Sequence, residues 1–313
     1  MIKNKYSELC KTESLPVFLQ NWWLDVVCGA DNWQPILVFD KNNQIIGASF
    51  YYNKIRYGIS TITQPILTPF SGLWFRPFVG KNERKKSQYE AEILKEVVEK
   101  LPNVSFFSQN FHFSLKNILP FHWAGFKNTL RYTYFFENIE NTKELYQGFN
   151  ENVTRNIKKG ENLIFEPSDD VKTLYNLYKS SLEHAKSKIS FSFDTLNLLY
   201  KKIKENEAGQ IFQVKDTENQ VVSASLLVWD KGTAYLLILG NSRLHQGGAT
   251  SLIWQLFPFL IGKNIKNFDL EGSMLPSVEK FYRSLGAERK PYFRISKAKN
   301  RFIEALLILA NKI

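Results

Sequence analysis

Residues 209–239, GQIFQVKDTENQVVSASLLVWDKGTAYLLIL, decide the fold. Three runs rich in β-branched, aromatic and aliphatic residues, Gly209–Lys215, Gln220–Trp229 and Thr233–Leu239, are separated by two short polar segments. Apolar runs that are broken by polar turns are typical of consecutive antiparallel strands. The sequence therefore predicts a three-stranded meander in the second half of the chain.

The segments that follow the meander alternate between helical and strand-like patterns. After a glycine-bearing loop come a helix, a strand, a second helix and a last strand, at Ala249–Ile261, Lys266–Leu270, Pro276–Leu285 and Lys290–Ile295. Such βα units after a meander are typical of a mixed sheet that is covered by helices. We expect residues 209–295 to form one continuous sheet whose middle strands part to admit a substrate.

The first half of the chain has a similar order of elements in reduced form. Its predicted elements are a helix at 17–27, a hairpin at 34–52, a loop-like segment at 53–80, a helix at 85–101 and a short strand at 104–107. A strand at 131–136 and helices at 142–159, 170–186 and 193–206 are predicted ahead of the meander. We therefore predict an α/β protein with mixed α+β sheets and two domains, residues 1–125 and 126–313.

Composition narrows the function classes. The chain has 313 residues, of which 44% are apolar, so it can bury two cores, and disorder is excluded as its main state. Its net charge of +11 favours an anionic partner such as a phosphate ester, a nucleic acid or a lipid head group. Cys10 and Cys28 stand in no Cys-x-x-Cys context and the four histidines are scattered, which argues against a disulfide framework and a metal site.

Neither a membrane anchor nor an export signal is evident in the sequence. The most apolar stretches, 251–262 and 302–310, are shorter than the roughly 20 residues that span a bilayer. The first residues are charged, and the apolar core of a secretory signal does not follow them. We therefore expect a soluble, cytoplasmic protein.

Two carboxylates near the end of a predicted strand are the main candidates for chemistry. In Lys266–Gly272 the strand period of two places Asp269 and Glu271 on one face, and Phe268 and Leu270 on the other. A central strand usually buries both faces, so carboxylates at its carboxyl end fit a cleft better than a core. We expect them to bind an amine and act as general base; a salt bridge to a lysine or arginine is the alternative.

Short phrases, together with the order of the elements, resemble a known family. They are Gly240–Ser251, Phe268–Ser273, Glu279–Ala287, Pro120–Phe126 and Arg131–Tyr134. The second half resembles the GNAT acyltransferase fold, and the whole chain resembles the tandem-GNAT proteins of the FemAB-like group, with a degenerate first domain. In that group the donor is an aminoacyl-tRNA for cell-wall peptidyltransferases and an acyl-CoA for other members.

The resemblance implies roles for several residues. Tyr282 would be the general acid that protonates the leaving group, although its helical spacing also suits a core aromatic. The backbone of the strand that ends at Leu239 would polarise the carbonyl group. The donor phosphate would be held by Gly247, Gly248, Ala249 and Thr250.

The glycine loop departs from the coenzyme A fingerprint of the family. That fingerprint is Arg/Gln-x-x-Gly-x-Gly/Ala, which cradles a pyrophosphate at a helix amino terminus. Here Leu244 or His245 would occupy its first position, depending on which glycine is aligned. The alternative is a glycine turn that only begins a helix.

Further candidate ligand-binding residues lie outside this region. Arg155 and Lys158 stand on a basic helix that would either contact a phosphate-rich ligand or form a solvated face. Trp74 and His112 would line a substrate cleft, or simply pack. Residues 280–301 carry eight basic residues and one acidic residue, which suits a tRNA backbone or an anionic membrane surface.

These observations predict an enzyme, an N-acyltransferase of GNAT type. It would move an acyl group from acyl-CoA, such as acetyl-CoA, to an amine acceptor such as an amino sugar or a cell-envelope precursor, without a metal. One alternative is an aminoacyl-tRNA-dependent peptidyltransferase of the FemAB-like group. Another is a non-catalytic protein that binds an anionic saccharide or a lipid head group.

Overall fold

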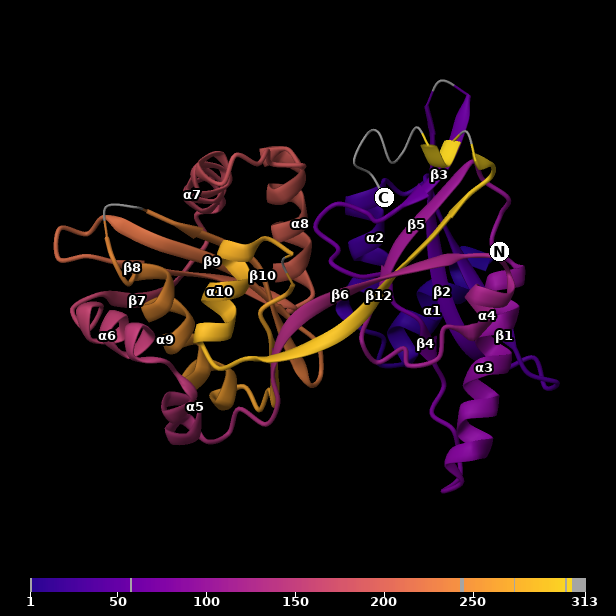
Figure 1. Cartoon of the computed structure of the whole chain (residues 1–313), viewed down its shortest axis with the longest axis horizontal. Helices are drawn as coiled ribbons and strands as arrows, with labels where there is room; N and C mark the ends of the chain where they lie inside the picture. Colours follow the sequence, from indigo (N-terminus) through magenta and orange to yellow (C-terminus); the bar gives the residue numbers. More distant parts are fainter. Residues whose placement is uncertain (1, 57, 243–244, 273, 302, 306–313) are drawn as a thin grey trace. The chain divides into compact units, whose positions relative to one another are not determined.

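The computed structural model describes residues 2–56, 58–242, 245–272, 274–301 and 303–305. The chain divides into two compact units (Figure 1). The first contains the chain up to Arg131 together with the segment from Pro291 onward, and the second contains Tyr132–Lys290. From the sequence we predicted a division after residue 125, which placed the segment from Pro291 onward in the second domain. The structure places this segment in the first unit.

The first unit contains four α-helices, a short 3-10 helix and five strands that lie wholly within it among the described residues. They are α1 (Ile2–Thr12), η1 (Val17–Leu19), α2 (Asn21–Cys28), β1 (Trp33–Phe39), β2 (Ile45–Arg56), β3 (Ile59–Thr63), β4 (Trp74–Phe75), α3 (Glu83–Glu99), β5 (Phe106–Phe111) and α4 (Leu119–Trp123).

The second unit begins with two short helices and ends with a helix that follows its last buried strand. Its elements are α5 (Thr142–Gly148), α6 (Glu151–Lys159), β7 (Ile164–Ser168), α7 (Val171–His184), α8 (Phe193–Glu205), β8 (Gly209–Lys215), β9 (Val221–Trp229), β10 (Thr233–Asn241), α9 (Gly248–Gly262), β11 (Asn267–Asp269) and α10 (Pro276–Ser284). Two strands, β6 (Lys127–Phe136) and β12 (Glu288–Ala298), begin in one unit and end in the other.

The sheet of the second unit is built on the predicted meander. Its strand order is β6-β11-β10-β9-β8-β7, in which β10 and β11 are parallel and all other neighbours are antiparallel. Helices α7 and α8 pack on one face of the meander, and α9 packs on the other (Figure 1). This arrangement confirms the α/β fold with mixed sheets.

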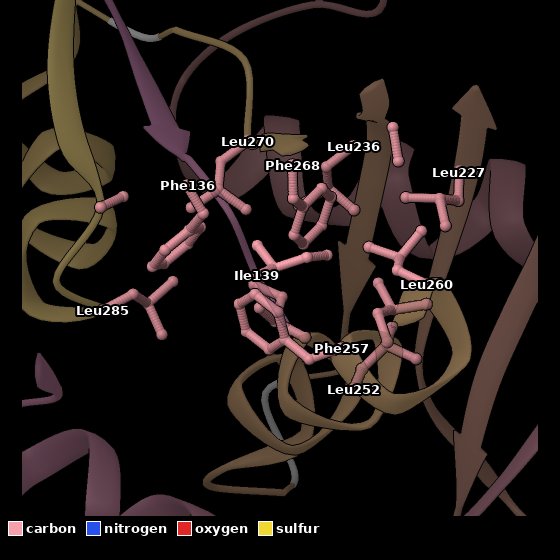
Figure 2. Close-up of a cluster of buried hydrophobic side chains, with 14 of the residues drawn as sticks. Phe136, Ile139, Leu227, Leu236, Leu252, Phe257, Leu260, Phe268, Leu270 and Leu285 are labelled. Atoms are coloured by element: carbon pink, nitrogen blue, oxygen red, sulfur yellow. The ribbon is translucent and has the colours of Figure 1, made fainter. Parts of the chain in front are cut away.

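A large apolar core lies between the sheet and α9. It contains residues from β6, β9, β10, β11 and α9, including Phe136, Leu236, Phe257 and Phe268 (Figure 2). Phe268 and Leu270 face this core, as the strand period predicts. Asp269, between them, therefore faces the side of the sheet on which α7 packs.

Strands β10 and β11 part in the middle of this sheet. They pair over only three residues of β10, Thr233–Tyr235, which lie opposite Asn267–Asp269. Beyond Tyr235, β10 continues beside β9 to Asn241, with a bulge between Leu236 and Ile238. The chain after β11 instead follows β6, because the Leu270 N–H donates to the Tyr134 carbonyl at 2.8 Å. The expected parting of the middle strands is therefore present.

The strand expected at 290–295 does join this sheet, so the expected continuous sheet is present. It belongs to β12, which lies next to β6 in the strand order and runs on to pair with β5 through Phe293–Ala298. The antiparallel neighbour of β11 is β6, a strand from earlier in the chain. Strand patterns identify both segments as strands but carry no information on which distant strand each one joins.

The first unit repeats the order of the second. Its strand order is β1-β2-β3-β5-β12, with β3 and β5 parallel, and β4 pairs with β2. In each unit a three-stranded meander is followed by a helix and by a strand parallel to the third strand, and an antiparallel strand from elsewhere in the chain, β12 or β6, pairs with that parallel strand. The prediction that the first half is a reduced copy of the second half is confirmed at the level of element order.

Several elements differ from the prediction. Helix α1 and strand β7 were missed, and the segment 53–80 contains β3 and β4 besides its loops. The helix expected at 17–27 is interrupted at Gln20, which is extended with a ψ of 135° and whose side-chain amide donates to the Leu15 carbonyl. Among the described residues no helix is both long and apolar enough to cross a membrane.

Candidate active site

Asp269 is the most deeply buried acidic residue of the second unit. It is the last residue of β11, it is 1% exposed, and it lies where β10 and β11 part. Its Oδ1 accepts hydrogen bonds from the Thr133 hydroxyl and from the Glu271 N–H. Its Oδ2 is buried and has no hydrogen-bond partner among the described residues. One carboxylate oxygen is therefore fixed by hydrogen bonds, and the other has no protein partner among the described residues.

Glu271 lies two residues beyond Asp269 in an unusual backbone conformation. Its φ of 57° is in the left-handed region, which non-glycine residues rarely adopt. Its Oε1 is buried and, among the described residues, has no hydrogen-bond partner. The next residue, Gly272, packs so closely on the Tyr132 carbonyl that a side chain would not fit. The local fold therefore holds Glu271 in place.

Burial raises the pKa of both carboxyl groups. The pKa of Asp269 rises from 3.8 to about 7 because desolvation outweighs its hydrogen bonds from Thr133 and Glu271. The pKa of Glu271 is raised further above its usual value by burial and by the negative charge of Asp269. No described lysine or arginine forms an ion pair with either group, so the salt-bridge alternative is not supported. At neutral pH we expect Asp269 to ionise first.

Two tyrosines from two helices, Tyr178 of α7 and Tyr282 of α10, lie near the two carboxyl groups. The ring of Tyr282 also contacts that of Tyr134 of β6, with centroids 5.6 Å apart, but the Tyr134 hydroxyl donates a hydrogen bond to Glu279. Burial, and after it the charge of Glu271, raises the pKa of Tyr178 on α7 and of Tyr282. Both phenols therefore remain protonated at neutral pH, and among the described residues neither hydroxyl has a hydrogen-bond partner. A protonated phenol beside an ionisable carboxyl group is suited to general acid catalysis.

Tyr178 is held in place by close backbone packing. Helix α7 approaches β10 at Gly240, where a Cβ atom would lie 2.6 Å from the Tyr178 nitrogen. The Tyr178 ring stacks on Phe191 with centroids 5.9 Å apart. Any larger residue than glycine at position 240 would push α7 away from the sheet and displace this phenol.

The structure places the predicted donor-phosphate residues at the start of α9. Gly247 is its N-cap residue in a left-handed conformation, and Gly248, Ala249 and Thr250 form its first turn. A Cβ atom on Gly247 would lie 2.6 Å from the Asn156 carbonyl oxygen of α6, and one on Gly248 would lie 3.0 Å from Asn241 Oδ1.

Gly247 is therefore required by a contact within the chain and by its left-handed conformation, and Gly248 lies in tight contact with Asn241. These contacts agree with the helix-starting turn that we gave as the alternative, and the role of these residues in holding a donor phosphate stays a prediction. Leu239 pairs with Ser225 in the parted section of β10. Leu244 and its neighbour at 243 lie outside the described residues.

The other predicted ligand-binding residues belong to two different units. Arg155 and Lys158 are exposed on α6, which packs on α9. Trp74 is 7% exposed in the first unit and carries Arg76 over its ring, as a packing residue would. His112 of the same unit is largely buried among aromatic rings, and desolvation lowers its pKa to about 4.

The first unit lacks the two carboxylates. The parallel pair Thr63–Ser108 occupies the position that Tyr235–Asp269 occupies in the second unit. By that register Ser108 corresponds to Asp269 and Asn110 corresponds to Glu271. The chemistry that depends on buried carboxyl groups is therefore confined to the second unit.

Sequence reasoning identified Asp269, Glu271 and Tyr282, and the structure brings these three together. It missed Thr133 and Tyr178. Thr133 reaches Asp269 from a strand 136 residues earlier in the chain, and no local pattern reports such a pairing. Tyr178 lies on the helix predicted at 170–186, but only the packing of α7 on β10 reveals which face it occupies.

Comparison with known proteins shows the fold. The sequence matches no protein-family model and no curated protein. Among solved structures, FemX is similar with a TM-score of 0.67 and 12% identity, covering 98% of both chains.

Two further structures align over 98% of this chain and 94% of their own chains. They are L-PGS from Bacillus licheniformis, with a TM-score of 0.56 and 13% identity, and the C-terminal domain of a putative lysylphosphatidylglycerol synthetase from Agrobacterium fabrum, with 0.55 and 10%. With its repeated element order, this chain therefore has the FemX-like fold of two GNAT-like domains in tandem, the first of them degenerate.

Proposed function

We propose that this protein transfers an acyl or aminoacyl group to an amine at the edge where β10 and β11 part. The observation that carries the proposal is the carboxyl group of Asp269, which is buried, has one free oxygen and has a pKa near 7. A general base works best when its pKa lies near the operating pH. The likeness to FemX and L-PGS supports a transferase.

In the proposed reaction the amine nitrogen attacks the carbonyl carbon of the donor and gives a proton to Asp269 Oδ2. The new C–N bond forms as the donor bond, a thioester C–S or a ribose ester C–O, breaks. Tyr282 gives its proton to the departing sulfur or oxygen, and the proton that Asp269 has taken from the amine then restores the phenol. Thr133 and the Glu271 N–H fix the other oxygen of Asp269, so that Oδ2 keeps its orientation.

The parted section of β10 supplies groups that could stabilise the oxyanion of the reaction. From Leu236 to Asn241 its edge away from β9 has no strand partner among the described residues. Backbone N–H groups on such an edge can stabilise the oxyanion that develops on the carbonyl oxygen. Glu271, whose pKa is raised by burial and by the charge of Asp269, would hold the incoming group through its unpartnered Oε1.

Two donors remain candidates, acyl-CoA and aminoacyl-tRNA. The packing around Gly247 and Gly248 gives no support for a coenzyme A cradle, whereas the FemX-like fold and the exposed Arg155 and Lys158 favour a charged tRNA. The acceptor would be a primary amine such as an amino sugar or a cell-envelope precursor.

An assay with both donors tests the proposal. The purified protein is incubated with hydroxylamine and a panel of primary amines, and with either labelled acetyl-CoA or bulk tRNA charged with labelled amino acids. We expect N-acylated product from charged tRNA that disappears after ribonuclease treatment. Formation of product from acetyl-CoA without RNA would mean that the donor is an acyl-CoA. Absence of product with every donor would favour the non-catalytic binding protein.

A further inference from the structure

A second candidate ligand site lies in the first unit. A cavity of about 520 Å³ is formed between the end of α3, the loop that follows it, the start of β5, the loop after α4 and the end of β12. All of its lining residues belong to the first unit. Cavities of 300–1,000 Å³ are the usual size for small-molecule sites.

The floor of this cavity is apolar. Val98, Leu101, Val104, Phe107 and Phe126 contribute side chains to it. The rings of Phe107 and Phe126 pack edge to face with centroids 5.2 Å apart, which fixes one wall. Asn103 is the one uncharged polar side chain among the lining residues, so the cavity offers few groups that could recognise a sugar or a nucleobase.

Two lysines make the cavity electropositive. Lys297 is a residue of β12, Lys299 follows directly after the end of this strand, and both line the cavity. Lys297 Nζ donates to the Ala124 carbonyl at 2.7 Å and lies 5.0 Å from the centre of the Phe126 ring. The Lys299 ammonium group has no ion-pair partner among the described residues, and no carboxylate lines the cavity.

We propose that this cavity binds an anionic amphiphile, a single aliphatic chain that ends in a carboxylate or a phosphate. The chain would occupy the floor of Val98, Leu101 and Val104, where each methylene removed from water adds to the affinity. The anionic head would accept hydrogen bonds from Lys297 and Lys299. A bare anion would leave the floor unfilled, and a neutral lipid would leave both ammonium groups without a counter-charge.

Calorimetric titration of the full-length protein tests this site. Octanoate is the probe, 1-octanol is the neutral probe with the same chain length, and inorganic phosphate is the bare anion. We expect octanoate to bind at least tenfold more tightly than either, and to shift the methyl NMR signals of Val98, Leu101 and Val104. The K297Q and K299Q variants should each weaken octanoate binding about tenfold, because a charge-assisted hydrogen bond is lost. K85Q, at an exposed position of α3, is the matched control and should bind octanoate as the parent does.

Each other outcome overturns the proposal. Equal affinity for octanol would show a general apolar site, and equal affinity for phosphate would show a general anion site. Methyl shifts confined to the second unit would place the ligand elsewhere. Absence of binding to octanoate, together with binding to vesicles that contain anionic phospholipid, would indicate a membrane-contact surface instead.

Discussion

The Asp269→Asn variant is expected to lose transfer activity by a factor of about 10²–10⁴, the usual contribution of a general base. Asparagine has nearly the same shape and can still accept the hydrogen bonds from Thr133 and the Glu271 N–H. It cannot take a proton from the amine at neutral pH. The loss should therefore appear in kcat, with little change in the binding of the donor.

Matched variants make this prediction specific. Asp194→Asn, at an exposed position in the first turn of α8, should retain full activity. The Tyr282→Phe and Glu271→Gln double variant should abolish turnover while it still binds ligand. If Asp269→Asn keeps the activity of the parent, Asp269 is not the base and the proposed mechanism is wrong.

The second large expected effect is a change of the free energy of unfolding with pH. Its direction follows from the raised pKa of Asp269. Because the pKa of Asp269 is raised from 3.8 to about 7, the folded protein holds a proton that the unfolded chain has released between these pH values. The free energy of unfolding therefore falls as pH rises from about 4 to about 7 and then levels off. At about 1.4 kcal/mol for each pKa unit, the contribution of Asp269 is on the order of 4 kcal/mol.

Denaturant unfolding at pH 4.5 and pH 8 measures this effect. The free energy of unfolding of Asp269→Asn minus that of the parent should be larger at pH 8 than at pH 4.5, by up to the amount above. Glu271→Gln should change in the same direction, because burial and Asp269 raise the pKa of Glu271 as well. The Asp194→Asn control should not change. If the difference between the parent and Asp269→Asn is the same at pH 4.5 and at pH 8, Asp269 is ionised at little cost and the prediction is wrong.

The sequence predicted local elements better than their partners. The apolar runs of Gly209–Lys215 and its neighbours specify strands through side-chain pattern alone, and the strand period placed Asp269 opposite the core. Neither β6 nor β12 could be assigned to a sheet in this way, because the pattern that identifies a strand does not say which distant strand it joins. The hydrogen bond from Thr133 to Asp269 depends on that long-range choice.

The two glycines at the start of α9 show the same difference between what a local pattern predicts and what long-range contacts decide. Gly247 and Gly248 were read from the sequence as a cradle for donor phosphate or as a turn that begins a helix. Their surroundings, the Asn156 carbonyl and Asn241 Oδ1, come from elements far away in the chain. Without these contacts a glycine that makes room for a ligand cannot be distinguished from one that makes room for the protein itself.

The pH dependence of kcat/KM tests the central claim most directly. Hydroxylamine is a suitable acceptor because it is mostly neutral near pH 7, and dividing the profile of the parent by that of Asp269→Asn removes the contribution of its own ionisation. The account predicts that this ratio rises with pH through a midpoint near 7, where Asp269 loses its proton. A ratio that stays constant with pH would contradict the assignment of Asp269 as the base.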